Sequence, residues 1–432
     1  MNKFLSKNKK YFTKRNTVLA SLTFILLLIL PVIVILSAQQ KNLKSNAAGA
    51  ANIEVENGTI AGSVAMVNDT NASGGKYMKF GSAQVCGGPL TITQGGNYSG
   101  CYESTNVSTP AVQINTTSPV TLDKATIRHK GEGIVNMGSA HLTVTNSTFL
   151  ALDPGIPANQ RNVYLYKPTS FVFENNSLSD GHGILINGDN VAANTIRIRY
   201  NTVVNIGRYA PPSCCIQFVQ FDKVLSSGAE IAWNKVTNVF GQSNVEDVIN
   251  MYKSNGTQAS PIRIHHNLID GAFPPTAASG YSGGGIIAGD AGGSWITISD
   301  NRVLSTINYG VAISGGHDNH LVNNRVVSDN KAADGTAFTA GNVGFYVWNY
   351  STSPDWGNNN ATNNASGWLK ADLTRNDWWI PDCNPIGSCT GNTNLPNPIT
   401  ASTEQAERDG WAADVVAAGL TIGPIAATPT PL

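Results

Sequence analysis

The sequence predicts an all-β fold built from stacked repeating units, and one recurring phrase is the main reason. A short phrase that begins with asparagine returns seven times between Thr145 and Val326. The phrases are Asn146-Ser-Thr, Asn176-Ser-Leu, Asn201-Thr-Val, Asn234-Lys-Val, Asn267-Leu-Ile, Asn301-Arg-Val and Asn324-Arg-Val. Successive asparagines lie 30, 25, 33, 33, 34 and 23 residues apart. A phrase repeated at such a period indicates supersecondary units that stack on one another.

The stretches that precede these asparagines identify the units as strands. Apolar and polar residues alternate in Leu142-Thr-Val-Thr, Phe171-Val-Phe-Glu, Ile196-Arg-Ile-Arg, Ile262-Arg-Ile-His and Ile296-Thr-Ile-Ser. Alternation of period two is typical of a β-strand with one buried side. Two short strands with their turns need about 22–25 residues, so the longer gaps are interpreted as the same coil with a loop added.

This pattern resembles the right-handed parallel β-helix of the pectate-lyase-like superfamily over residues 85–365. The resemblance implies a single β-helix of about ten coils, in which each coil contacts only its neighbours. Asparagine tolerates left-handed backbone and bonds to nearby main chain at bends. We therefore expect the repeated asparagines to occupy one bend of successive coils and to bond to one another along the axis.

The two ends of the chain differ from the repeats. Residues 1–16 carry six basic groups and no acid, and residues 17–38 are almost wholly apolar. A helix of that length spans about 30 Å, which predicts a single-pass membrane anchor with the β-helix outside the cell. The alternative is a cleaved signal segment and a secreted protein, although Leu36-Ser-Ala38 is a poor cleavage site.

The segments that flank the β-helix have their own character. Residues 39–52 are a polar linker, and residues 53–84 are expected to cap the first coil. Their Glu54-Val-Glu-Asn and Ala72-Ser-Gly-Gly-Lys motifs resemble the opening of β-sandwich carbohydrate-binding modules. Residues 366–432 are read as loops, a helix and a tail. Glu404 to Gly419 is the predicted helix, with Thr403 as its cap and Trp411, Val415 and Val416 on one side.

Composition limits the partners and the compartment. Formal net charge is zero and no basic stripe contains interleaved aromatic residues, so the sequence predicts no nucleic-acid partner. Six cysteines in an exported chain suggest disulfides. Cys86 with Cys101, and Cys383 with Cys389, form plausible local pairs, while the adjacent Cys214 and Cys215 are expected to be buried thiols.

Candidate chemistry lies on the second strand of each coil. Alignment of these strands puts His182, Asp247 and Tyr309 near one strand edge. It puts Lys253, Asp290 and the pair His317 and Asp318 near the other edge, with Asn250 and Tyr252 pointing outward between them. The predicted catalytic residues are Asp247, Lys253, Asp290, His317 and Asp318, and the predicted substrate-binding residues are His182, Arg208, Asn250, Tyr252 and Tyr309. Insertions at 207–213, 238–246 and 270–284 would wall a groove over this surface, as in polysaccharide-binding sites.

Three functions fit these residues. A uronate lyase or C5-epimerase would use Lys253 or a histidine as base, with Arg208, or a Ca²⁺ ion at Asp247 and Asp290, neutralising the carboxylate. A glycoside hydrolase would use two carboxylates from neighbouring coils. A membrane-tethered protein that binds glycans without catalysis would rely on aromatic rings such as Tyr252, Tyr309 and Trp348. The sequence favours the lyase slightly, because Lys253 lies among acids. It identifies no certain cofactor, and Ca²⁺ is a possible one.

Overall fold

The computed structural model describes residues 64–68, 76–80, 85–155, 159–210, 216–274 and 282–425. The chain divides into two compact units, residues 1–85 and 86–432. In the first unit, β1 (Val64–Asn68) pairs antiparallel with β2 (Lys76–Phe80). The predicted basic segment, membrane anchor and linker at residues 1–52 lie outside the described residues. Within the described ranges, none of the helices combines the length and apolar character that a membrane span requires.

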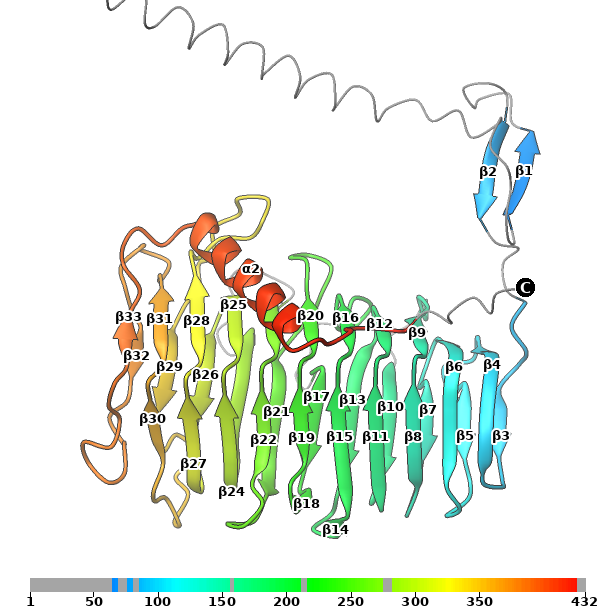
Figure 1. Cartoon of the computed structure of the whole chain (residues 1–432), viewed down its shortest axis with the longest axis horizontal. Coiled ribbons are helices and arrows are strands. Elements are labelled where there is room, and N and C mark those ends of the chain that lie inside the picture. Colours follow the sequence, from blue (N-terminus) through cyan, green and yellow to red (C-terminus); the bar gives the residue numbers. More distant parts are fainter. Residues whose placement is uncertain are drawn as a thin grey trace, which may run out of the picture. The chain divides into compact units, whose positions relative to one another are not determined.

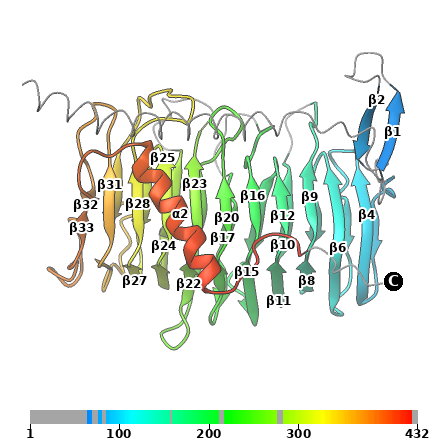
Figure 2. The ribbon, with the colours of Figure 1, turned by 45° about the horizontal axis from the view of Figure 1, so that its top comes forward.

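The second unit is a parallel β-helix, as predicted, but each coil carries three strands rather than two (Figures 1 and 2). We call the three stacks faces 1, 2 and 3, in the order in which the chain visits them. Face 1 contains β3 (Leu90–Ile92), β5 (Val112–Ile114), β7 (Ile134–Asn136), β10 (Arg161–Tyr166), β13 (His182–Asn187), β17 (Val219–Asp222), β21 (Asp247–Asn255), the first half of β24 (Gly284–Ser299), β26 (Tyr309–Ile313), β29 (Val343–Val347) and β32 (Trp378–Trp379).

Faces 2 and 3 complete each coil. Face 2 contains the first halves of β4 (Gly96–Ser104) and β6 (Val120–His129), then β8 (His141–Thr145), β11 (Ser170–Glu174), β15 (Thr195–Arg199), β19 (Glu230–Ala232), β22 (Ile262–His265), the second half of β24, β27 (His317–Val322) and β30 (Asn360–Thr362). Face 3 contains the second halves of β4 and β6, then β9 (Thr148–Ala151), β12 (Ser177–Ser179), β16 (Thr202–Val204), β20 (Lys235–Thr237), β23 (Leu268–Ala272), β25 (Arg302–Thr306), β28 (Arg325–Ser328), β31 (Ala365–Trp368) and β33 (Thr393–Asn394). The short strands β14 (Ala192–Ala193) and β18 (Leu225–Ser226) pair at the corner between faces 1 and 2.

The third strand explains the repeated phrase. The residues after each repeated asparagine form the face 3 strand, which has three residues after Asn201 (Thr202–Val204) and five after Asn267 (Leu268–Ala272). Strand pairing also continues beyond residue 365, since β32 and β33 add to the stack. The bore is filled by aligned aliphatic and aromatic side chains. One column on face 2 runs through Val144, Phe173, Ile198, Ile231, Ile264, Ile298, Leu321 and Ala361, all fully buried.

The repeated asparagines form a continuous ladder at the corner between faces 2 and 3. Each side-chain Nδ2 donates to Oδ1 of the asparagine on the next coil, as Asn234 does to Asn267 at 2.9 Å and Asn267 to Asn301 at 2.9 Å. Nδ2 also donates to a main-chain carbonyl of the preceding coil, at 3.0 Å from Asn267 to Ile231. The ladder extends beyond the seven phrases to Asn364 and Asn392.

Two details of the predicted ladder are wrong. Asn146 is not a member, because Ser147 takes its place and donates its main-chain N–H to Oδ1 of Asn176 at 2.8 Å. The left-handed residue is the one before each ladder asparagine, with φ of 54° at Asn175 and 57° at Asn323. The ladder asparagines therefore serve as hydrogen-bond bridges and leave the sharp bend to the preceding residue.

The C-terminal helix α2 (Ala401–Ala417) lies diagonally across face 3 (Figures 1 and 2). It starts earlier than predicted: Thr400 is the N-cap, and its N–H donates to Oγ1 of Thr403 at 3.1 Å. Trp411 is buried, but Val416 is 79% exposed. At about 100° per residue, the step from 411 to 416 turns the side chain away from the body.

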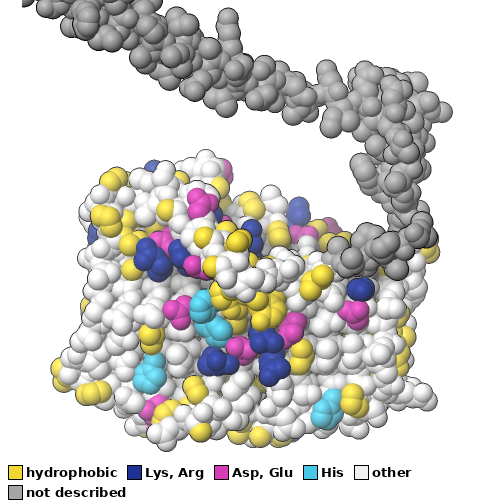
Figure 3. Space-filling model, in the orientation of Figure 1, with side chains coloured by type: hydrophobic (Ala, Val, Ile, Leu, Met, Phe, Trp, Pro, Cys, Tyr) yellow, Lys and Arg dark blue, Asp and Glu magenta, His cyan; other side chains and the backbone are white. Residues whose placement is uncertain are grey.

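Charged pairs hold α2 against the coils, and Figure 3 shows basic and acidic side chains next to each other on the side that carries the helix. Glu407 accepts from Arg302 at 2.7 Å and from Arg325 at 2.6 Å, while Arg408 donates to Asp270 at 2.7 Å. The residues after α2 continue along the corner: Gly423 N–H donates to the carbonyl of Tyr200 at 2.7 Å.

Glu404 makes the docking of α2 sensitive to pH. Burial raises the pKa of this carboxyl from 4.5 to about 7, so the folded protein binds the proton more tightly than the unfolded chain does. The contribution of Glu404 to stability is therefore complete below pH 4.5 and is lost as the pH rises through about 7. We expect the melting temperature of Glu404→Gln to fall less than that of the unchanged protein between pH 4.5 and 8. Equal slopes in the two proteins would contradict this assignment.

Two disulfides staple the ends of the β-helix. Cys86 is joined to Cys101 and Cys383 to Cys389, the two pairs that the sequence placed close together. Cys214 and Cys215 lie outside the described residues.

Candidate functional site

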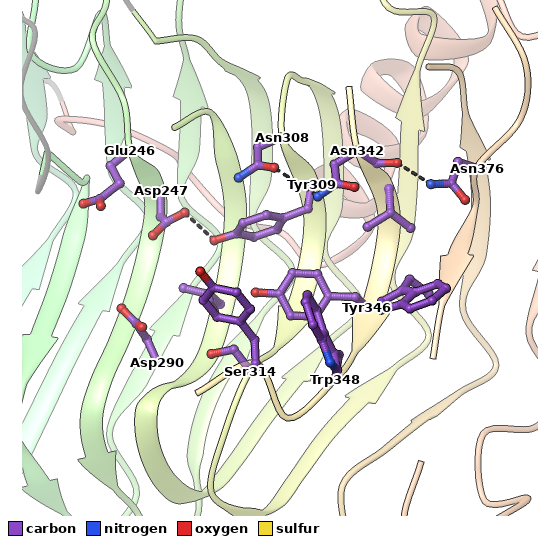
Figure 4. Close-up of a pocket in the computed structure, with 14 residues that line it drawn as sticks. Glu246, Asp247, Asp290, Asn308, Tyr309, Ser314, Asn342, Tyr346, Trp348 and Asn376 are labelled. Carbon is purple, nitrogen blue, oxygen red and sulfur yellow. Dashed lines mark hydrogen bonds between the residues drawn. The ribbon is translucent and has the colours of Figure 1, made fainter. Parts of the chain in front are cut away.

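A cavity of about 640 Å³ lies on the outer surface of face 1, toward the C-terminal coils (Figure 4). Its floor follows from the strand register. Outward residues stack in a column in which Asn250 pairs with Ile287, Ala312 with Tyr346, and Tyr346 with Trp379. The cavity spans four steps from β21 to β32, or about 19 Å at about 4.8 Å per step. Carboxylates line one end, amides line one wall and aromatic rings line the other.

The carboxylate end is organised around Asn250. Its Nδ2 donates to Oδ2 of Asp247 at 2.9 Å and to Oδ2 of Asp290 at 2.9 Å. Because both oxygens lie 2.9 Å from one nitrogen, they are at most 5.8 Å apart, twice that distance. Asn250 is almost fully buried, and its Oδ1 has no hydrogen-bond partner among the described residues. The amide therefore fixes the separation of two acids on neighbouring coils.

Asp290 reaches Asn250 because β24 contains an irregularity. Asn250 pairs with Ile287, but Tyr252 pairs with Asp290, so β24 has one more residue than β21 over this step. A β-bulge of this kind re-aims the side chains that follow it.

Tyr309 completes an acidic centre that also contains Asp247, Asn250 and Asp290. It lies two coils from Asp247. Its hydroxyl donates to Oδ1 of Asp247 across the intervening strand β24. The residue between them is Gly284, where an added Cβ would lie 2.3 Å from Asp247 Oδ1 and 2.4 Å from the Tyr309 ring. Only glycine leaves room for this contact.

Burial and neighbouring charges raise the pKa values of Asp247 and Tyr309. Burial, followed by the charge of the neighbouring Glu246, raises the pKa of Asp247 from 3.8 to about 7. Burial, followed by the charge of Asp247, raises the pKa of Tyr309 well above 10, so its hydroxyl remains a donor. Glu246 also lines the cavity and accepts from Gln217 Nε2 at 2.9 Å. Near neutral pH, Asp247 can therefore hold or release a proton.

The structure does not bring the other predicted residues into this cavity. Lys253 lies with its ammonium 5.1 Å from the centre of the Tyr252 ring, and neither residue lines the cavity. His317 and Asp318 bond to each other at 2.6 Å where face 1 turns into face 2, also outside the lining.

His182 and Arg208 are engaged elsewhere as well. His182 precedes Asp247 by two coils, and burial lowers its pKa from 6.5 to about 4, with Arg161 and His129 contributing. Arg208 pairs with Asp180 at 3.4 Å.

Several lining residues escaped prediction. The most regular are Asn308, Asn342 and Asn376, which repeat at an interval of 34 residues, one coil apart, just before strands β26, β29 and β32. That interval is visible in the sequence and could have identified the row. Trp379 and Tyr346 have no comparable signal, because their outward direction depends on the strand register.

Within the described ranges, no three or more His, Cys, Asp or Glu side chains are grouped in a way that could hold a metal ion. The Ca²⁺ site expected at Asp247 and Asp290 stays a prediction.

The comparisons with known proteins concern the fold. A family model described as "Right handed beta helix region" matches residues 90–220. No curated protein and no solved structure matches the chain. The match supports a right-handed β-helix. Because it ends before Glu246, the first residue of the cavity lining, it leaves the cavity unassigned. The chain thus contains a right-handed β-helix with an acidic and aromatic cavity on one face, which is consistent with a polysaccharide-active protein. The resemblances to the pectate-lyase-like superfamily and to carbohydrate-binding modules stay expectations.

Proposed function

We propose that this protein hydrolyses glycosidic bonds in a polysaccharide, with Asp247 and Asp290 as its two catalytic carboxylates. The observation that carries this proposal is the bridge from Asn250, which keeps one oxygen of each acid within 5.8 Å of the other. Retaining glycosidases use carboxyl groups about 5–5.5 Å apart, whereas inverting enzymes separate them by about 6.5–9.5 Å. The proposed reaction is therefore a double displacement with retention of configuration.

In the first step, Asp247 gives its proton to the glycosidic oxygen. The bond between that oxygen and the anomeric carbon breaks, and an oxygen of Asp290 bonds to the anomeric carbon. In the second step, Asp247 takes a proton from water, the water oxygen bonds to the anomeric carbon, and the ester to Asp290 breaks. Tyr309 donates to Asp247 throughout, which stabilises the charged form that exists between the two steps.

The cavity lining favours hydrolysis over lyase chemistry. A lyase must neutralise the carboxylate of a uronate, yet no Lys, Arg or His is among the described residues that line the cavity. The lyase hypothesis also relied on Lys253 as a base among the acids, and Lys253 lies over Tyr252 instead.

Product analysis on soluble polysaccharides tests the proposal. Neutral and uronate polymers are incubated with the full chain, with Ca²⁺ or with a chelator, and three signals are followed. New reducing ends whose first anomer has the substrate's configuration are the expected result. Inverted product would remove the double displacement. An unsaturated product absorbing in the ultraviolet would replace hydrolysis with a lyase, and a requirement for Ca²⁺ would support the predicted ion site. No product from any polymer would favour the glycan-binding alternative.

The rate is expected to fall on the alkaline side of neutrality. Asp247 must be protonated to act as the acid, and its raised pKa of about 7 sets the pH at which half of the molecules lose that proton. We expect kcat/KM to drop about tenfold for each pH unit above this value. A profile that stays flat to pH 9 would exclude Asp247 as the acid.

The proposal places the reaction outside the cytoplasm. The bonds Cys86–Cys101 and Cys383–Cys389 support this location, because disulfides persist in oxidising compartments. Anchoring through residues 17–38, or secretion after cleavage, is decided by N-terminal sequencing of the membrane fraction and the medium.

A further inference from the structure

Beyond the acidic centre, the cavity continues along the β-helix axis between two unlike walls (Figure 4). One wall is a row of amides with one member per coil: Asn308, Asn342 and Asn376. The row is braced by its own hydrogen bonds. Asn342 N–H donates to the carbonyl of Asn308 at 3.0 Å, and Asn376 Nδ2 donates to the carbonyl of Asn342. Neighbouring amides are therefore about 4.8 Å apart along a fixed line.

Aromatic rings that face solvent line the side opposite the amides, where Trp348 forms the wall and Trp379 ends the column of the floor. Trp348 is 40% exposed and Trp379 is 52% exposed, although large aromatic side chains are usually covered. The centre of the Trp348 ring lies 5.1 Å from the ring centre of Tyr350 and 6.3 Å from that of Trp379, so the three rings form one patch. Exposed apolar patches next to polar groups mark binding surfaces.

The charge of the lining restricts what can bind there. Glu246, Asp247 and Asp290 stand at one end, and the described lining contains no cation. An anionic sugar would approach these acids without a compensating charge. Amides, in contrast, donate to and accept from hydroxyl groups, and an aromatic wall accepts the apolar face of a pyranose ring.

We infer that this part of the cavity binds a run of uncharged pyranose units laid parallel to the β-helix axis. Their hydroxyl edges contact Asn308, Asn342 and Asn376, and their ring faces lie on Trp348 and Trp379. The inference rests on the proposed function for the position of the bond that is cut, which lies beside Asp247 and Asp290. It deepens that proposal by specifying an uncharged substrate. Several sugar units bind along the coils that follow Asp247 and Asp290 toward the C-terminus of the protein.

Binding to an inactive variant tests the inference separately from hydrolysis. The full chain carrying Asp290→Asn is titrated with cellohexaose, xylohexaose, mannohexaose and hexagalacturonate, and tryptophan fluorescence and heat are recorded. We expect at least one neutral hexasaccharide to bind and hexagalacturonate to bind at least about tenfold more weakly.

Further substitutions in the same background locate the site. Trp379→Ala and Asn342→Leu are each expected to weaken binding by about tenfold or more. Trp295→Ala is the matched control, because Trp295 lies outside the cavity lining and contacts His317. Melting temperatures show whether each variant is folded.

The outcomes separate the two proposals. Tighter binding of hexagalacturonate, no binding of any neutral hexasaccharide, or binding that ignores both Trp379→Ala and Asn342→Leu would overturn the inference. Neutral hexasaccharides that bind through Trp379 and Asn342, but are never cut by the unchanged protein, would instead overturn the hydrolase proposal and leave the inference standing.

Discussion

Asp290→Asn is expected to lower kcat/KM by at least about 10⁴-fold, because an amide cannot form the covalent intermediate. Asp247→Asn is expected to lower it by about 10²–10⁴-fold through loss of the acid and base. Neither change should unfold the chain, since asparagine has nearly the same shape and Asn250 can bond to its amide oxygen. Initial rates on the best neutral polymer measure both effects.

Asp318→Asn is the matched control for these two variants. Asp318 is a partly buried carboxylate on the same β-helix that bonds to His317 and does not line the cavity. Its φ of 54° suits asparagine as well as aspartate. A loss in Asp318→Asn equal to that in Asp290→Asn would show that the cavity is not the catalytic centre.

The second large effect concerns the asparagine ladder. Asn267 donates to Ile231 at 3.0 Å and to Asn301 at 2.9 Å, and its Oδ1 accepts from the main-chain N–H and the Nδ2 of Asn234 at 3.0 and 2.9 Å. Asn267→Ala leaves several of these fully buried groups without partners. Each such group costs about 1–3 kcal/mol, so we expect a loss of about 4 kcal/mol or more in the free energy of unfolding.

Denaturant unfolding followed by circular dichroism measures this loss. Asn323→Ala is the comparison, because Asn323 is exposed at the same corner and outside the ladder. Its left-handed backbone makes alanine cost about 1–2 kcal/mol there. Equal losses at the two positions would mean that the ladder contributes nothing beyond the bend.

The sequence was sufficient to predict that coils stack into a parallel β-helix, but not to predict that each coil has three strands. Strand alternation and repeated asparagine predicted parallel β-helix coils because both depend on local side-chain chemistry. The third strand was missed because it is only three residues long in several coils, too short to show alternation. The register slip at Asn146 arose because Asn146 and Ser147 can both fill positions at the same corner, and only the contact with Asn176 distinguishes them.

The acidic centre shows a similar limit. Asp247, Asn250 and Tyr309 could be placed together by aligning strands, since they precede the point at which β21 and β24 fall out of register. Pairing shifts between Asn250 and Tyr252, and again before Ser254. An alignment that assumes regular pairing fails after that point, so Lys253 was placed among the acids when its side chain lies outside the cavity.

Helix α2 and the residues after it change how the β-helix is expected to unfold. A solenoid normally frays from its ends, one coil at a time, because each coil touches only its neighbours. Here α2 bridges Asp270, Arg302 and Arg325 on three coils, and the residues after it bond to Tyr200 and Asn175. Opening any of these coils must also release the helix. Native-state hydrogen exchange should therefore show the coils from Asn175 to Arg325 opening together as one cooperative unit, and coil-by-coil fraying should appear only when residues after 400 are removed.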